Sequence, residues 1–336
     1  MKANALRTGK AMSAALFVLL LVVVGTKNAL AQTQVATLQH GDDVSVFYGQ
    51  NAFVEAHAAA ETGDIITLSS GTFVKTPITK AITLRGAGCA IDTVANTNPT
   101  VIGQNIELMV DDSENYLTIE GILFSGGVSI QSQLHSPKLT RCNFEYINVY
   151  NQSFSMSDAQ FTNCIINVFS FKYTYNTVLI NSVVWGSDQI SNNYPVEIYN
   201  SIMRMPWSTN GLSANNSIII PSNSIGSNCS FTNCIAIRNS SSPFGYGYTN
   251  NCVSYNSYEE VFNTFVGSFS FDEPFILKDE IATGFLGNDG TEVGIHGGIM
   301  PYTARPSYMI IRHCNVANKS TIDGKLSVDI EVVTEE

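Results

Sequence analysis

A short sequence phrase is repeated in the middle of the chain, and one position of it holds a different polar or aromatic group in each of four successive copies. These groups are a carboxylate, an amide, an indole and a guanidinium. Each follows a Cys or Ser of that phrase by three residues: Glu145, Asn167, Trp185 and Arg204. Stacked copies would place them side by side, where a ring can stack on a sugar and charged groups can bond its hydroxyls. The column is therefore a candidate glycan-binding face. An ordinary solvated face with one exposed Trp is the favoured alternative, because the sequence leaves the strand phase open.

Acidic residues are too sparse in this region to predict a catalytic centre. Between residues 121 and 258 the chain has only Glu145, Asp158, Asp188 and Glu197. Calcium takes about six to eight oxygen ligands, and glycoside hydrolysis needs two neighbouring carboxyl groups. No two of these acids hold clearly matching positions in neighbouring copies. Catalytic residues are left unassigned for this reason, and no metal site is predicted.

Other chemically reactive residues have simpler interpretations. His57, His135 and His296 have no partner at the spacing of a metal site or a catalytic triad. Asp111-Asp112 and Asn288-Asp289-Gly290 lack the spacing of a calcium loop. We predict ordinary packing for the histidines and turns for the two acidic segments.

Aromatic residues alternate with polar ones between residues 169 and 175: Phe169, Phe171, Tyr173 and Tyr175. On one strand they would share a face, as a sugar platform or as part of the core. The intervening residues have a solvated character, so the core is the favoured interpretation.

The elements that position these residues follow from the repeated phrase, which is Asn, then Cys or Ser, then two mostly apolar residues. Its copies begin at Asn163, Asn181, Asn200, Asn216, Asn233 and Asn251, after a degenerate copy at residues 141–144. Successive Cys or Ser positions lie 16 to 22 residues apart, too close for two helices. β-branched and aromatic residues favour strands, and so short a unit must stack on its neighbours to bury a face. The sequence predicts an all-β solenoid, a parallel β-helix with strands about 4.8 Å apart.

The phrase also assigns roles to its Asn and Cys residues. Asn tolerates the tight bend between strands, and stacked Asn amides can bond to one another as a structural ladder. Of seven cysteines, an odd number, four lie in the repeat: Cys142, Cys164, Cys234 and Cys252. No CxxC pair or zinc spacing occurs. We therefore predict that these four are small buried hydrophobes in one column.

Both ends of the repeat region have their own patterns. Residues 51–61 predict a short helix that caps the open end of the solenoid. Its apolar stripe would be Phe53, Ala56, Ala59 and Ala60. The first strand is expected at Ile65–Leu68. At the other end, Tyr308 to Val316 and Leu326 to Val333 predict a small β hairpin around Asp323-Gly324.

The N-terminus is typical of a secretory signal peptide. Lys2, Arg7 and Lys10 precede an apolar run of 11 residues, which is too short to span a membrane, and Ala29-Leu30-Ala31 offers a cleavage site. Cleavage near Ala31 predicts a secreted, periplasmic or cell-surface protein without a membrane span. We expect a signal peptide at residues 1–31, a capped β-helix at 32–300 and a β tail at 301–336.

The charge balance argues against one class of partner. The chain has 17 Lys and Arg against 28 Asp and Glu, and four of the positive charges lie in the first 31 residues. Their removal would leave a net charge of −15. A nucleic-acid partner needs a basic face, so no nucleic-acid binding is expected.

Three stretches resemble a known family. AHAAAETGDIITLSSGTF and ITKAITLRGAG resemble the opening of secreted right-handed β-helix proteins of the pectate-lyase-like superfamily, and GNDGTEVGIHGG resembles a segment after the last coil of Bacteroidetes-type members. The resemblance covers roughly residues 45–300 and implies a right-handed coil. Such folds include polysaccharide lyases, glycoside hydrolases and surface proteins without shown catalysis, so no single activity is implied. A Ca²⁺ cofactor would be implied only by a lyase-like site.

These observations favour an exported, non-catalytic or weakly catalytic surface protein that contacts a polysaccharide or another glycan. A polysaccharide lyase or glycoside hydrolase acting on an extracellular polysaccharide is the first alternative. A structural or adhesive spacer that binds protein is the second. The sequence predicts no oligomeric state.

Overall fold

The computed structural model describes residues 34–92, 97–110, 116–149, 151–188, 190–221 and 224–304, and the backbone of 310–316 and 328–333. The predicted signal peptide, the Asp111-Asp112 turn and the Asp323-Gly324 turn lie outside the described residues.

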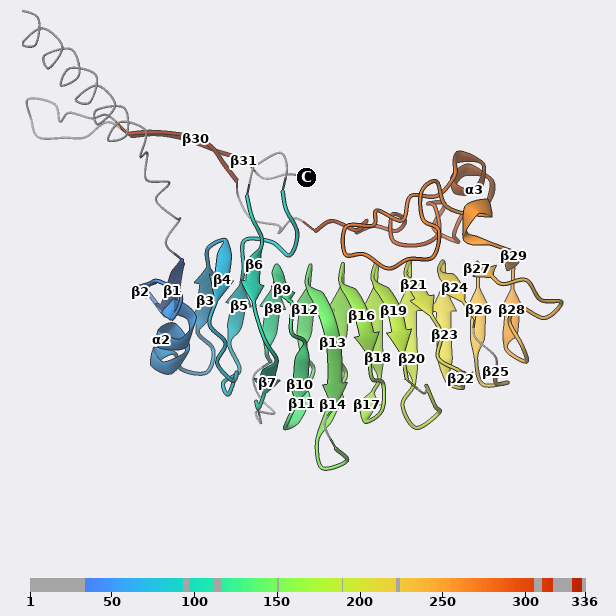
Figure 1. Cartoon of the computed structure of the whole chain (residues 1–336), viewed down its shortest axis with the longest axis horizontal. Helices are drawn as coiled ribbons and strands as arrows, with labels where there is room; N and C mark the ends of the chain where they lie inside the picture. The colour runs from blue at the N-terminus through green and yellow to red at the C-terminus, as the bar shows by residue number, and fades with distance from the viewer. Residues whose placement is uncertain are drawn as a thin grey trace, which may run out of the picture. The chain divides into compact units, whose positions relative to one another are not determined.

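The chain coils into a right-handed parallel β-helix of about nine turns, which confirms the fold predicted from the repeat (Figure 1). Successive turns add strands to two long sheets, parallel except at the N-terminal end of the first. The first sheet consists, in spatial order, of β2 (Asp43–Tyr48), β1 (Val35–His40), β3 (Ile65–Leu68), β5 (Thr83–Arg85), β8 (Thr118–Glu120), β12 (Lys138–Thr140), β15 (Gln160–Thr162), β18 (Thr177–Ile180), β20 (Val196–Tyr199), β23 (Leu212–Asn215), β26 (Ser230–Thr232) and β28 (Tyr248–Asn250). The second consists of β4 (Gly71–Phe73), β6 (Thr100–Ile102), β9 (Ile122–Phe124), β13 (Asn143–Val149), β16 (Ile165–Phe169), β19 (Val183–Ser187), β21 (Ile202–Arg204), β24 (Ile218–Ile220), β27 (Ile235–Ile237) and β29 (Val253–Tyr255), with β7 (Ile106–Leu108) and β10 (Val128–Ile130) joined to it beside β13.

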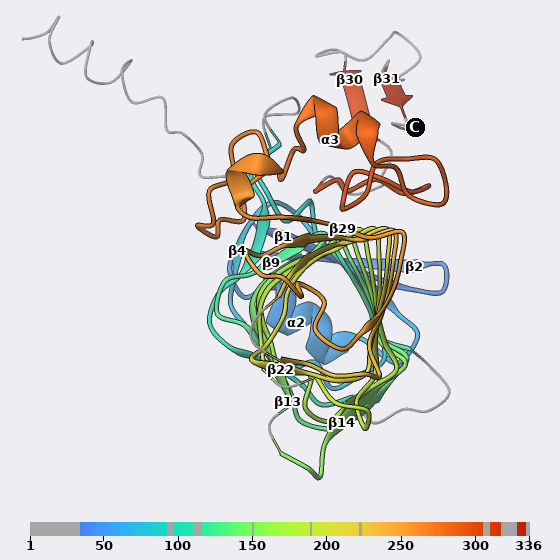
Figure 2. The ribbon, with the colours of Figure 1, turned by 90° about the vertical axis from the view of Figure 1, so that its right-hand side faces the viewer.

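Shorter strands form a third side of the coil. These are β11 (Gln133–His135), β14 (Ser155–Ser157) and β17 (Thr174–Tyr175), followed farther along the coil by β22 (Ser208–Thr209) and β25 (Ser224–Ile225). Figure 2, which looks along the coil, shows the turns superimposed around one interior. Apolar side chains from all three sides fill that interior, among them Phe124 and Phe144, whose rings stack at a centroid distance of 5.0 Å.

The Asn residues of the repeat form the corner between the first and second sheets. All six have a left-handed backbone, with φ between +45° and +54°. Asn adopts this conformation more readily than other non-Gly residues, which explains its recurrence. Gly121, with φ +68°, begins the same phrase position in an earlier turn.

The Cys and Ser residues after these asparagines form a hydrogen-bonded column inside the coil, which we call the spine. It comprises Cys142, Cys164, Ser182, Ser201, Ser217, Cys234 and Cys252. The N–H of Ser182 donates to Ser201 Oγ on the next turn at 3.1 Å, while Ser201 Oγ donates to the Tyr199 carbonyl at 2.8 Å. Cys164 Sγ makes the corresponding contact to the Thr162 carbonyl at 3.4 Å. Cys and Ser are interchangeable at this position because each is small and offers both a donor and an acceptor.

The N-terminal end is capped by α2 (Ala52–Ala59), as predicted, which Figure 2 shows across the coil interior. Phe53 and Ala56 are buried as expected. Ala59 is exposed, and His57 is buried in its place, so the predicted stripe is partly wrong. The chain reaches α2 through an antiparallel hairpin of β1 and β2, which the sequence did not predict; β3 is therefore the first strand of the coil but the third of the chain.

A second core lies outside the coil. Residues 258–304, which we call the cover segment, include η1 (Tyr258–Glu260) and α3 (Asp279–Gly284). Their apolar side chains pack on the outward side chains of the second sheet. That sheet contributes Ile165, Val183, Trp185, Ile202, Ile218, Ile220, Ile235 and Ile237, and the cover segment contributes Val261, Phe262, Phe265, Phe275, Leu277, Ile281, Val293 and Ile295. The repeat phrase therefore buries both of its apolar residues, the second inside the coil and the first under the cover segment.

The asparagine corner anchors the cover segment. Asn181 Nδ2 donates to the carbonyls of Ile295 and Gly297 at 2.9 and 2.7 Å. Asn216 Nδ2 donates to Asn288 Oδ1 at 2.9 Å, and the Gly294 N–H donates to the Asn216 carbonyl at 2.8 Å. Gly294 has φ +84°, and a Cβ there would lie 2.9 Å from Ile218 Cδ1. Close approach to the coil thus explains the Gly-rich composition of this stretch.

The predicted C-terminal tail is a β hairpin. β30 (Ile310–Val316) pairs antiparallel with β31 (Val328–Val333), and the register is irregular between Ile311 and His313.

Candidate functional site

The predicted column of Glu145, Asn167, Trp185 and Arg204 lies on successive strands of the second sheet. Asn167 Nδ2 donates to Glu145 Oε1 at 2.8 Å, and the Arg204 guanidinium lies 5.3 Å from the Trp185 ring centroid. The four residues are thus neighbours in two contacting pairs.

Trp185 is not an exposed platform, because the cover segment lies over it. Its exposed fraction is 7%. Phe265 packs edge-on at a centroid distance of 5.2 Å, and Phe269 stacks at 6.1 Å. Burial raises the pKa of Tyr258, whose ring also packs against the indole. The expectation of one exposed Trp on this face is wrong, because the cover segment was not predicted from the sequence.

The aromatic run at residues 169–175 divides between the core and the surface. Phe169 and Phe171 are fully buried and stack at a centroid distance of 4.2 Å. β16 ends at Phe169, and Tyr173, in the turn that follows Phe171, has a left-handed backbone with φ +63°. Tyr175 emerges on β17 with an exposed fraction of 40%. The core interpretation is confirmed for the two Phe residues and wrong for Tyr175, because a turn interrupts the alternation.

The structure assembles a different aromatic group on the third side of the coil, which we call the tyrosine patch: Lys172, Tyr173, Tyr175 and Tyr194. The Tyr194 ring meets Tyr175 at 5.3 Å and Tyr173 at 5.9 Å, both edge-on. Lys172 Nζ lies 4.9 Å from the centre of the Tyr173 ring. The patch therefore combines aromatic rings, phenol hydroxyls and one cation on a surface that the cover segment does not bury.

Polar side chains continue the tyrosine patch onto the preceding turns. His135 pairs in register with Ser157, and Ser157 with Tyr175, so the three share one column. His135 Nδ1 lies 2.9 Å from Ser157 Oγ. Asn176 follows Tyr175 and Asp158 follows Ser157, and Asn176 Nδ2 donates to the exposed carboxylate of Asp158 at 3.0 Å. A ligand on the patch would find donors and acceptors beside the rings.

Two more exposed aromatic residues follow on later turns of the same side. Trp207, 74% exposed, precedes β22, whose Thr209 pairs with Ile190 of the Tyr194 turn. Tyr246, 86% exposed, donates its N–H to the carbonyl of Ile225 on β25. Figure 1 shows β17, β22 and β25 along one edge of the coil. On this side of the coil, exposed rings are thus distributed along the coil axis.

The hydroxyl of Tyr194 stays protonated at neutral pH. Desolvation raises its pKa, and the adjacent phenols of Tyr175 and Tyr173 raise it further. A protonated phenol can donate a hydrogen bond to a ligand oxygen.

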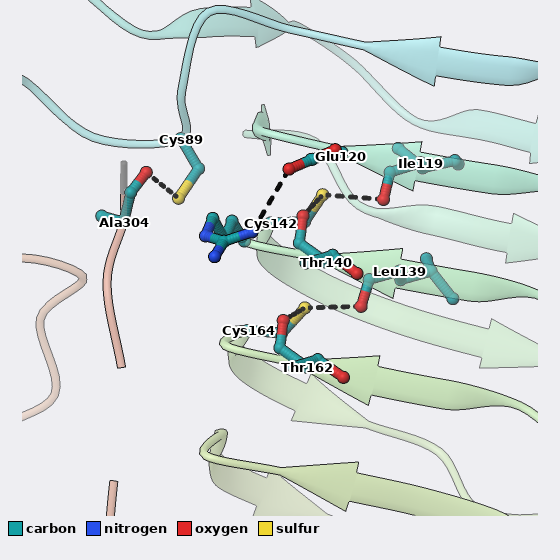
Figure 3. A network of polar contacts seen from close by, with 10 residues as sticks. Cys89, Ile119, Glu120, Leu139, Thr140, Cys142, Thr162, Cys164 and Ala304 are labelled. Carbon is teal, nitrogen blue, oxygen red and sulfur yellow. Dashed lines mark hydrogen bonds and ion pairs between the residues drawn. The ribbon is translucent and has the colours of Figure 1, made fainter. Parts of the chain in front are cut away.

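The buried thiols lie in surroundings that make them unreactive. Figure 3 shows Cys142 and Cys164 on successive turns, with Cys89 between them and Ala304 of the cover segment. Cys89 Sγ lies 3.8 Å from the Ala304 carbonyl, and burial raises the pKa of all three thiols. Nearby, Arg141 and Glu120 form an ion pair at 3.3 Å. Protonated, desolvated thiols are poor nucleophiles and poor metal ligands.

The remaining histidines have structural contacts. The Thr79 N–H donates to His57 Nε2 at 3.2 Å, and His296 Nε2 lies 2.7 Å from the Pro274 carbonyl. Within the described ranges, no group of three or more His, Cys, Asp or Glu side chains could hold a metal ion. The Asn288-Asp289-Gly290 segment is a turn of the cover segment.

Comparisons of the chain with protein-family models, with curated proteins and with solved structures found no match. In the part of the chain that the structure describes, no helix combines the length and the apolar character needed to cross a membrane.

Proposed function

We propose that this protein is exported and that its β-helix binds glycan chains through the tyrosine patch as a non-catalytic or weakly catalytic surface protein. The observation that supports the proposal is the meeting of exposed Tyr175 with the half-buried rings of Tyr173 and Tyr194 on a side of the coil that the cover segment does not bury. Rings there can stack on the apolar face of a sugar, while the neighbouring hydroxyl, amide and carboxylate groups bond its hydroxyls.

The distribution of the accessible rings favours a polymer over a single sugar. Exposed Tyr175, Trp207 and Tyr246 and half-buried Tyr194 lie on different turns of one side. Turns rise by about 4.8 Å each, so the rings are spread along the axis over several turns. An extended polysaccharide lying parallel to the axis would contact several rings, and weak contacts at each would add through multivalency.

Lys172 suggests a preference among glycans. The mature chain is predicted to be strongly acidic, which disfavours acidic polymers over most of its surface. Lys172 places a cation at the patch itself, 4.9 Å from the Tyr173 ring centroid. We therefore expect neutral chains to bind, with sparsely charged acidic chains favoured only where a carboxylate can reach Lys172.

A protein partner is a second candidate, supported by the composition of the surface. Tyr is the commonest residue there, with a Ser hydroxyl and an Asn amide beside it, and these three residue types are enriched in antibody paratopes, where they recognise proteins. This candidate corresponds to the adhesive spacer predicted as an alternative from the sequence.

Affinity electrophoresis against neutral and acidic polysaccharides tests the proposal. The double variant Tyr175→Ala, Tyr194→Ala should weaken binding by about tenfold or more, since loss of a stacking residue costs over ~1 kcal/mol. Tyr48→Ala is the matched control, because Tyr48 is 67% exposed on β2, outside the patch. Equal losses in both variants, or no retardation by any polysaccharide, would refute glycan binding and favour the spacer.

The same incubations test the enzymatic alternative. Release of reducing or unsaturated ends that disappears in Asp158→Asn would identify a lyase or hydrolase instead. A non-catalytic or weakly catalytic chain is expected to release at most a trace above the level of a heat-inactivated sample.

A further inference from the structure

The two ends of the coil differ in how they are closed. α2 covers the N-terminal end, whereas β28 and β29 form the last described turn, at the opposite end in Figure 1. In this last turn, exposed Thr249 takes the inward position that buried Phe231 holds one turn earlier. In the same way, exposed Ser254 takes the position of buried Ala236. Solvent therefore reaches the interior column of the last turn.

Two spine cysteines lie in register at this open end. Thr232 pairs with Asn250 and Ile235 with Val253, so Cys234 and Cys252 are direct neighbours across the sheet corner. Cys234 Sγ lies 3.3 Å from the Thr232 carbonyl, and Cys252 Sγ lies 3.4 Å from the Asn250 carbonyl, so both side chains point the same way. Neighbouring parallel strands are about 4.8 Å apart, within the Cα separation that a disulfide spans.

The environments of the two thiols differ. Cys252 is partly exposed, whereas Cys234 is fully buried. A hydrogen bond from the Cys234 thiol, together with its backbone N–H, holds the pKa of Cys252 below the ordinary value of a thiol. Burial raises the pKa of Cys234. Cys252 thus combines accessibility with thiolate character, the two properties that make a thiol reactive.

We propose that Cys252 is a modification site for low-molecular-weight disulfides and that Cys234 resolves the product into a disulfide across the last two turns. In the first step the Cys252 thiolate attacks one sulfur of the reagent, forming a mixed disulfide and releasing one thiolate. In the second, the thiolate released in the first step takes the proton of Cys234, whose sulfur then attacks the Cys252 sulfur and releases the other half of the reagent. The pair loses two electrons and two protons, and the reagent is reduced to two thiols.

The open end permits the movement that this bond requires. In-register side chains stand parallel, so the two sulfurs must approach each other by a change of rotamer or a small shift of the last turn. No described turn stacks beyond β28 and β29, so a shift of the Cys252 corner displaces no further turn of the coil. The contacts of Val253 and Tyr255 with the cover segment limit the size of that shift. The resulting bond would be strained and readily reduced, unlike a permanent structural disulfide.

Oxidised glutathione added to the full chain tests the proposal, with peptide mass mapping after acid quenching. The expected product is a Cys234–Cys252 disulfide without a retained glutathione. Cys142 and Cys164 are the internal control, because they hold the same register on two earlier turns but are fully buried. Before oxidation, iodoacetamide should label Cys252 at least about tenfold faster than Cys164.

Two substitutions separate the roles of the pair. Cys234→Ser should leave a stable glutathione adduct on Cys252, and Cys252→Ser should leave Cys234 as a free thiol. Both variants should fold, because Ser occupies the same spine position at Ser182, Ser201 and Ser217. Equal labelling of Cys252 and Cys164, or a glutathione adduct that persists while Cys234 is present, would overturn the proposal.

Discussion

The outward faces of the two long sheets are formed by the same turns, but one face is exposed to solvent and the other is buried. On the first sheet the outward column is mainly polar, with Lys138, Gln160 and Glu197 among its members, and nothing in the described structure lies over it. On the second sheet the corresponding column is aliphatic, with Ile165, Ile202 and Ile218, and the cover segment buries it. A strand with two apolar faces must be buried on both. The comparison shows that a coil can recruit a second core on one side while another side stays available to solvent and ligands.

The largest test of this comparison is Phe265→Ala in the cover segment. Phe265 is 1% exposed and packs against Trp185 and Phe275. Its removal should lower the free energy of unfolding by about 3–5 kcal/mol, through lost burial and a residual cavity. Chemical denaturation followed by tryptophan fluorescence measures the effect. On the exposed face of the first sheet, Lys138→Ala should change the free energy of unfolding by less than about 0.5 kcal/mol. Similar losses in the two variants would contradict the difference between the two faces.

The attachment of the cover segment can be tested at the asparagine corner. Asn216→Ala removes the bonds to Asn288 and places Ala in a left-handed conformation, which should cost about 2–3 kcal/mol. Asn251→Ala suffers the same backbone penalty and loses its bond to Asn233, but has no bond to the cover segment. Thermal unfolding should therefore separate the two variants. Indistinguishable midpoints would mean that corner hydrogen bonds do not hold the cover in place.

The spine serves both sheets, and its chemistry gives a smaller test. Ser201→Ala leaves the buried N–H of Ser182 without its acceptor, at a cost of about 1–2 kcal/mol. Ser201→Cys keeps a donor and an acceptor, as in the Cys turns, and should cost less than the Ala substitution. Urea unfolding of both variants measures the difference, and a Cys variant less stable than the Ala variant would exclude the hydrogen-bonding role.

The smallest expected effect concerns pH at the capped end. Burial lowers the pKa of His57, so the unfolded chain binds a proton more readily than the folded one. His57 therefore destabilises the fold progressively as the pH falls below its unfolded pKa of about 6.5, and not above it. His40 acts in the opposite sense, because its hydrogen bond to Asp64 raises its pKa and adds stability that is lost as the pH rises. Unfolding midpoints of His57→Gln and His40→Ala across this range should shift in opposite directions relative to the unaltered chain.

The sequence predicted those parts of the fold that repeat or are local. The phrase period identified the parallel coil, Ile65–Leu68 was placed correctly as β3, and residues 51–61 contain α2. The Asn and Cys columns follow from the same period, because stacking turns equal positions into neighbours. The predicted amide ladder is confirmed only from Asn216 through Asn233 to Asn251, because the Asn181 amide bonds to the cover segment instead. The prediction of burial is wrong for Cys252, which lies at the open end of the coil.

The site could not be predicted in the same way, because it depends on contacts between distant residues. Trp185 occupies the expected strand position, but its exposure is decided by Phe265 and Phe269, some 80 residues later. Tyr175 and Tyr194 meet through a turn that ends the alternation after Phe171. The cover segment lacks the repeat, and only the paired apolar residues of the phrase indicate that the coil needs it.

The position of the cover segment in the chain imposes an order on biosynthesis. It begins at residue 258, after every strand that it protects. A growing chain can therefore complete its coil while a stripe of isoleucines and valines is still open to water, and transiently exposed apolar strands are prone to aggregate. A nascent chain would therefore most need a holding chaperone between the completion of β29 and the completion of the cover segment. A stop codon in that interval would yield an aggregation-prone product with an exposed apolar stripe, not a shorter functional protein.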